Sequence, residues 1–228
     1  ETMFRNNLCC YPHTKKDMYI SIGFNFTGGS LLRWYRDVFG QEELQVAKKK
    51  RRDVYDILTA KATKTPTNLL LLPHFTMTGT PYFDAKSKGV ILGLTLSTTN
   101  GDIIKAILEG VTYEMKLNVE LLDKSGIAIH EFRAIGGGAK SDLWMQLKAD
   151  ILGKPVVKLK VSEAACLGAA LLAGVAIGAY RSMDEAVRVT VKTEKTFHPN
   201  QTLNAQYEEK FNLYTHIYPL LRKVLHAM

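Results

Sequence analysis

The chain has 228 residues, 46% of them apolar and 23% charged, and its formal net charge at pH 7 is +8. This composition is ordinary for a soluble globular protein, and the chain is large enough to bury a sizeable core. No apolar run reaches the roughly 18 uninterrupted residues that a spanning helix needs, so we expect no membrane segment.

The amino-terminal stretch "ETMFRNNLCCYPH" lacks the charged-then-apolar order of a secretory signal, so the expected location is the cytoplasm. Three cysteines without metal-ligand spacing predict neither a disulfide framework nor a metal site. Cys166 lies among small apolar residues and is interpreted as a buried thiol. The basic run "AKKKRRD" at 47–53 has no interleaved aromatic residues or glycines, so it predicts a solvated face rather than a nucleic-acid site, and it leaves a small anionic ligand open.

Strands and helices are expected to alternate in the amino-terminal half. The expected elements are a strand over 17–26, a glycine turn at 28–29, a helix over 30–40 with Ser30 as N-cap, a helical stretch over 42–62, a buried strand over 69–73, a loop over 74–84 and a strand over 89–96. His74, Asp84 and Asp102 are interpreted as structural residues, Asp102 as a helix cap.

The carboxy-terminal half continues the same alternation, which predicts an α/β layer architecture. Its expected elements are a helix over 103–123, a strand over 132–135, a glycine cluster at 136–138, a helix over 141–152, a strand over 156–161, a buried small-residue helix over 163–180 and a terminal helix over 203–228 that breaks near Pro219.

Two glycine turns each precede a predicted helix, Gly28-Gly29-Ser30 and Gly136-Gly137-Gly138-Ala139-Lys140-Ser141. Backbone N–H groups and the dipole at a helix amino end favour anions, and missing side chains let a ligand come close. A purely structural turn is the alternative for either one. The second turn has neither the G-x-G-x-x-G spacing of a dinucleotide site nor the G-K-[ST] of a Walker loop.

The segment "GVILGLTLSTTNGDIIKAILE", 89–109, resembles the carboxy-terminal signature of the FGGY carbohydrate kinases. Gly89, Gly93, Asp102, Ala106 and Glu109 stand at the fixed positions of that signature. Three more segments resemble consecutive parts of the same family: "GGSLLRWYRD" at 28–37, "IGGGAKSDLWMQLKADILGKPV" at 135–156 and "EAACLGAALLAG" at 163–174.

The resemblance implies that residues 1–228 form a carboxy-terminal nucleotide-binding domain. The implied fold is α/β, ribonuclease-H-like (actin-like ATPase), with a mixed sheet flanked by helices, and the implied cofactors are ATP and Mg²⁺. The residues implied to hold adenosine are Gly136, Gly137, Gly138, Ala139 and Ser141. Those implied to lie nearer the phosphates are Gly29, Ser30 and Arg33.

The resemblance further implies transfer of the γ-phosphoryl group of ATP to a sugar or polyol hydroxyl, with a xylulokinase-like enzyme favoured. The sugar contacts and the catalytic base are expected in an amino-terminal lobe that this chain lacks, so no catalytic residue is expected here and the chain alone should be inactive. "TGT" at 78–80 replaces the family's G-E-R, which leaves the sugar open. A non-catalytic nucleotide- or protein-binding module of the same superfold is the alternative, and a homodimer is also left open.

Overall fold

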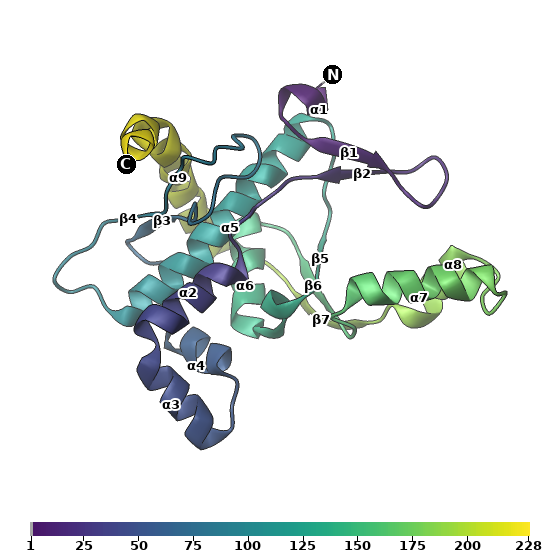
Figure 1. The fold of residues 1–228 in the computed structure, drawn as a ribbon, viewed down its shortest axis with the longest axis horizontal. Coiled ribbons are helices and arrows are strands. Elements are labelled where there is room, and N and C mark those ends of the chain that lie inside the picture. The colour runs from purple at the N-terminus through teal and green to yellow at the C-terminus, as the bar shows by residue number, and fades with distance from the viewer. Residues whose placement is uncertain (1) are drawn as a thin grey trace.

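A computed structural model describes residues 2–228 of the chain, coloured from one end to the other in Figure 1. The helices are α1 (Thr2–Arg5), α2 (Gly29–Phe39), α3 (Gln41–Lys50), α4 (Val54–Lys61), α5 (Asn100–Lys124), the 3₁₀ turn η1 (Gly137–Lys140), α6 (Asp142–Leu152), α7 (Ala164–Ala176), α8 (Met183–Thr190) and α9 (Gln201–Ala227). The strands are β1 (Cys9–Pro12), β2 (Tyr19–Ile22), β3 (Leu70–Leu72), β4 (Val90–Leu92), β5 (Phe132–Ala134), β6 (Val156–Leu159) and β7 (Thr193–Phe197).

The strands of residues 2–228 form three small sheets rather than one large sheet. β1 and β2 form an antiparallel hairpin, and β3 pairs with β4 in the same sense. The third sheet is mixed, because β6 runs parallel to β5 and antiparallel to β7. The α/β class and a mixed sheet are therefore present, and α6 packs beside the mixed sheet (Figure 1).

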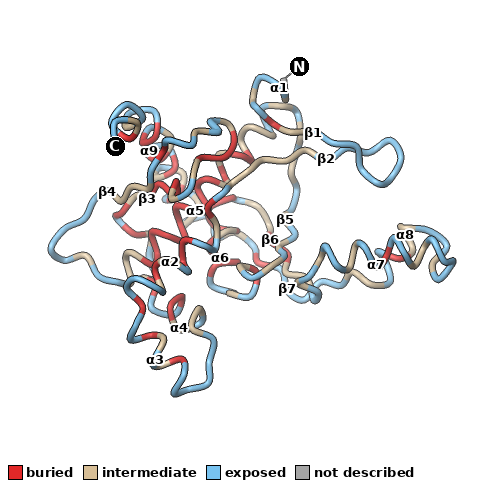
Figure 2. The backbone as a smooth tube through the Cα atoms, in the orientation of Figure 1, coloured by how far each residue is buried: buried red, intermediate tan, exposed pale blue. Residues whose placement is uncertain are grey.

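Helix α5 is the centre of the molecule and the most deeply buried element (Figure 2). A capping box begins it, in which the Thr99 hydroxyl accepts from the amide of Asp102 while the Asp102 carboxylate accepts from the amide of Thr99. Strand β3 crosses closely over it, since a Cβ at Gly110 would lie 2.3 Å from the carbonyl oxygen of Leu71. Helices α2, α4, α6 and α9 also pack against α5, which brings the amino end of α2 close to α6.

The predicted helical stretch over 42–62 is two helices, α3 and α4, separated at residues 51–53. Arg51 adopts a left-handed conformation with φ 51°, which ends α3. Asp53 then caps α4 by accepting a 2.8 Å hydrogen bond from the amide of Tyr55. The basic residues 48–52 are exposed, as expected.

Two predicted caps are wrong by a few positions. Ser30 is the second residue of α2 and not its N-cap; Gly28 holds that position, and no side chain caps the helix. Asp102 lies in the first turn of α5 and supports the cap Thr99. In both cases the chain enters its helix earlier than the apolar periodicity suggests, because helix ends depend on backbone hydrogen bonds.

The small-residue helix α7 is mostly exposed, which contradicts the expectation of a buried helix over 163–180. Cys166 is exposed too, so its interpretation as a buried thiol is wrong. The reason is that α7 packs mainly on α8, a helix that the sequence interpretation did not predict. Among the described residues, no further layer of structure covers the rest of α7. Strand β7, which closes the mixed sheet, was also not predicted.

Helix α9 runs through Pro219 without the predicted break. Tyr214, Ile217 and Tyr218 are buried before the proline and Leu225 is buried after it, so packing on both sides holds the two halves in line. No helix in the described chain combines the length and the apolar character that a membrane crossing needs.

Candidate functional site

The two glycine turns, which are more than 100 residues apart in sequence, line one cavity of about 270 Å³. The cavity lies between the amino end of α2, the helix α4, and the turn that joins η1 to α6. The lining residues are Gly29, Leu32, Arg33, Asp53, Tyr55, Asp56, Thr59, Gly137, Gly138, Lys140, Ser141 and Trp144. Both turns can therefore contact the same ligand.

Most of the residues expected to bind a ligand meet in this cavity, namely Gly29, Arg33, Gly137, Gly138 and Ser141. Three others are not among the described residues that line it. Ala139 is buried beneath the turn, Gly136 precedes it, and Ser30 is exposed outside the cavity.

The physical reason for glycine differs between positions 136 and 137. Gly136 has φ 77°, and it donates a 3.2 Å hydrogen bond to the carbonyl of Ser162, so the turn itself requires glycine there. At Gly137, a Cβ would meet no described atom within 4 Å. Folding does not demand a bare backbone at this position, and the free space belongs to the cavity.

Trp144 forms the floor of the cavity and is 4% exposed. Its indole Nε1 donates to the hydroxyl of Thr112 on α5 at 3.3 Å, and its backbone amide donates to the Ser141 hydroxyl, which caps α6. The Lys148 ammonium lies over the indole ring, 4.5 Å from its centre. Burial lowers the pKa of Lys148 to about 8. The hydrogen bond to Thr112 and the ammonium of Lys148 over the ring thus hold the Trp144 side chain in place.

The rim of the cavity carries two cations without an ion pair among residues 2–228, Arg33 and Lys140. It also carries two carboxylates, of which Asp53 is engaged in capping α4. The amino end of α2 borders the same space through Gly29, and no side chain caps it. Free cations and free N–H groups together suit an anionic ligand.

Helix α4 supplies one wall of the cavity through Tyr55, Asp56 and Thr59, and sequence reasoning missed all three. The Tyr55 hydroxyl accepts a 2.8 Å hydrogen bond from Arg36 of α2, which ties the wall to the neighbouring helix. The available signal was the cap Asp53, which would have marked a second helix beginning beside the basic run.

The three residues interpreted as structural lie outside the cavity and have protein partners. His74 is buried between the Ser87 hydroxyl at 2.7 Å and the Glu114 carboxylate at 3.4 Å. Asp84 accepts hydrogen bonds from Tyr218 and His226, and Asp102 serves the start of α5. Each of the three has the protein partners expected of a structural residue, and Asp102 supports the cap Thr99 rather than being the cap itself.

Fold and site together define an α/β domain in which two glycine turns line one cavity. The chain belongs to the FGGY family of carbohydrate kinases: the model of that family's C-terminal domain matches residues 4–177.

Relatives and solved structures agree with that membership. The chain is 30% identical to the xylulose kinase of Staphylococcus epidermidis over 95% of its own length and 42% of the relative's, and 36% identical to the glycerol kinase of Ralstonia nicotianae over 79% and 35%. The crystal structure of xylulose kinase from Rhodospirillum rubrum superposes with a TM-score of 0.80 at 27% identity, covering 96% of this chain and 43% of that one. The chain therefore spans less than half the length of these relatives.

Proposed function

We propose that this chain is the ATP-binding lobe of a carbohydrate kinase that transfers the γ-phosphoryl group of ATP to a sugar or polyol hydroxyl. One observation carries the proposal: two glycine turns more than 100 residues apart in sequence line the same cavity, and Gly137 faces free space there. Family membership supports it, since the relatives are xylulose, glycerol and gluconate kinases. The proposed fold is the ribonuclease-H-like, actin-like ATPase fold.

In this proposal the adenosine rests on the turn Gly136–Ala139, with the Ser141 hydroxyl beside it. A flat base can lie against backbone that has no Cβ atoms, and the buried Trp144 ring packs beside Gly138 and supports the turn. The phosphates extend towards Gly29, Ser30 and Arg33, where the uncapped amino end of α2 offers N–H groups and a positive dipole.

Mg²⁺ is proposed to arrive with the phosphates. Within the described residues there is no group of three His, Cys, Asp or Glu side chains that could hold a metal ion. Mg²⁺ commonly keeps several waters and binds through substrate phosphates, and no step is assigned to a metal-binding side chain of this chain.

Catalysis itself is proposed to need a second lobe. Phosphoryl transfer depends on positioning and on electrostatic stabilisation of the transferring group, and half a cleft supplies neither in full. The sugar contacts and the base that accepts the hydroxyl proton are assigned to that lobe. A xylulokinase-like acceptor is favoured, because xylulose kinases are prominent among both the relatives and the solved structures.

Calorimetric titration of the chain with ADP tests the nucleotide site. We expect binding of about millimolar affinity, or tighter, and a loss of at least about tenfold in Gly137→Val, because the valine side chain fills space that the nucleotide occupies. Gly168→Val is the matched control, since a Cβ at Gly168 also meets no described atom within 4 Å, but Gly168 lies on α7 and does not line this cavity. Equal affinities in wild type and Gly137→Val would refute the assignment.

A further inference from the structure

Helix α9 presents a line of large apolar side chains to solvent. Leu213, Leu220 and Val224 are 63%, 77% and 59% exposed, although the same helix buries six other large side chains against the body of the protein. At 3.6 residues per turn, positions seven and four residues apart lie within about 40° of one another around a helix, so the three side chains share one face. We call this line the α9 stripe. Single exposed leucines are ordinary on a protein surface, whereas a heptad-spaced line is typical of a helix that pairs with another helix.

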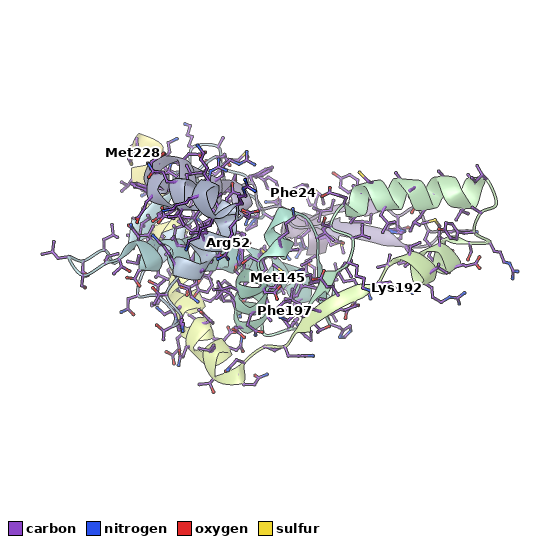
Figure 3. The ribbon with its side chains drawn as sticks, turned by 90° about the horizontal axis from the view of Figure 1, so that it is seen from below. Phe24, Arg52, Met145, Lys192, Phe197 and Met228 are labelled. Carbon is purple, nitrogen blue, oxygen red and sulfur yellow. The ribbon has the colours of Figure 1, made fainter. Side chains whose placement is uncertain are left out.

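The protein's own contacts lie on a different face of α9. The helix packs against α5, α6 and β3, and its buried side chains include Tyr207, Phe211 and Tyr214. Met228, just beyond the end of α9, lies on the opposite side of the molecule from Lys192, which stands at the foot of the arm formed by α7 and α8 (Figure 3). Figure 1 shows the same separation between α9 and that arm. None of the described residues covers the α9 stripe, so it is open to a partner.

The two ends of the α9 stripe carry charges of opposite sign. Glu209 lies four residues before Leu213, and Lys223 lies three residues after Leu220. Both charged side chains are on exposed residues, and neither forms an ion pair within residues 2–228. A helix that binds an anionic membrane carries cations along its polar face, and the acidic end of this stripe does not fit that arrangement. A partner with the reverse order of charges fits it.

We propose that the α9 stripe binds the same stripe of a second copy of this chain, with the two helices antiparallel. A two-fold axis makes such a contact self-complementary, so Leu213 of each copy lies beside Leu220 of the other. Glu209 then reaches the level of Lys223 and Val224 of the second copy, and two Glu209–Lys223 ion pairs close the ends of the contact. In a parallel pair the like charges would meet instead. The inference is independent of the nucleotide site, and either one can fail without the other.

Sedimentation equilibrium of the 228-residue chain tests the contact. The stripe offers three large side chains per copy, which is a small interface, so we expect a reversible monomer–dimer equilibrium with a dissociation constant in the micromolar range. Leu220→Glu should weaken the dimer at least about tenfold, because its carboxylate would lie against the apolar centre of the contact. Leu96→Glu, at an exposed leucine of the loop between β4 and α5, is the matched control and should leave the dimer unchanged. A monomer at every concentration up to about 500 µM, or a dimer that survives Leu220→Glu, would overturn the proposal.

Reversing the charges tests the antiparallel orientation. Glu209→Lys and Lys223→Glu should each weaken the dimer about fivefold or more, because each replaces two attractive pairs by two repulsive ones. The double variant Glu209→Lys with Lys223→Glu restores both attractions, so its dissociation constant should return to within about twofold of wild type. An equimolar mixture of the two single variants should likewise form a heterodimer. Single reversals without effect, or a double variant no tighter than the single ones, would overturn the antiparallel pairing.

Discussion

Asp84 fastens the loop that precedes β4 to the carboxy-terminal helix. Its carboxylate accepts hydrogen bonds from the Tyr218 hydroxyl and from His226 Nε2, the latter at 2.5 Å, and its side chain is 10% exposed. Burial by itself would raise the pKa of this carboxyl. The hydrogen bonds from Tyr218, His226 and the amide of Lys86 outweigh burial and hold the pKa well below its usual range.

Because the folded state lowers the pKa of Asp84, the stabilisation is present above the ordinary aspartate pKa of about 4 and is lost as the pH falls below it. We expect Asp84→Asn to lower the free energy of unfolding at pH 7 by roughly 1–3 kcal/mol, and to lose stability less steeply than wild type in acid. Urea unfolding at pH 7 and pH 3.5 measures both effects. Asp184→Asn, at an exposed ion pair, is the control and should change little; equal effects of the two substitutions would contradict this account.

The protonation of Lys148 should be detectable in the fluorescence of Trp144, which lines the cavity. Its ammonium lies 4.5 Å from the centre of the Trp144 ring, and burial lowers its pKa to about 8. Loss of that charge should alter the indole emission. In a Trp34→Phe background we expect the Trp144 fluorescence to titrate with a midpoint near pH 8, and Lys148→Met to abolish the transition. An unchanged titration in Lys148→Met would show that the cation does not act on the ring.

At the scale of elements, α9 illustrates how packing overrides a local signal. Pro219 is exposed and removes one backbone hydrogen bond, yet buried aromatic side chains before it and Leu225 after it keep the helix continuous. We expect Pro219→Ala to raise the free energy of unfolding by roughly 1–3 kcal/mol, since alanine restores the hydrogen bond without disturbing the buried face. Thermal unfolding followed by circular dichroism measures it. A lower melting temperature in Pro219→Ala would contradict this account, because it would show that the proline stabilises the helix.

Element types followed from the sequence more reliably than element partners. Apolar spacing predicted α5 and α6, and Gly153 in a left-handed conformation ends α6 as expected. The same spacing could not show that α7 is uncovered, because an apolar helix looks the same in sequence whether its partner lies in this chain or elsewhere. Helix α8 is amphipathic and capped by Ser182, a signal that the sequence interpretation missed. Strand β7 is mostly exposed, and its pairing with β6 holds it in place.

For the whole molecule, the candidate site was predictable in part. Each glycine turn could be read from its own sequence, but their convergence in one cavity depends on how α2 and α6 pack against α5. The wall formed by α4 depends on the same packing, and its residues Tyr55, Asp56 and Thr59 carry no motif. The sequence thus indicated where the backbone lacks side chains, at the two glycine turns, whereas tertiary packing determines which side chains surround those turns.

The central claim is that this chain seats a nucleotide between the two glycine turns. A crystal structure of the chain with ADP tests it most directly. We expect the adenine and ribose to lie against Gly136–Ala139 above Trp144, with the phosphates towards Gly29 and Arg33. ADP bound at any other place on the chain, with this cavity empty, would contradict the claim.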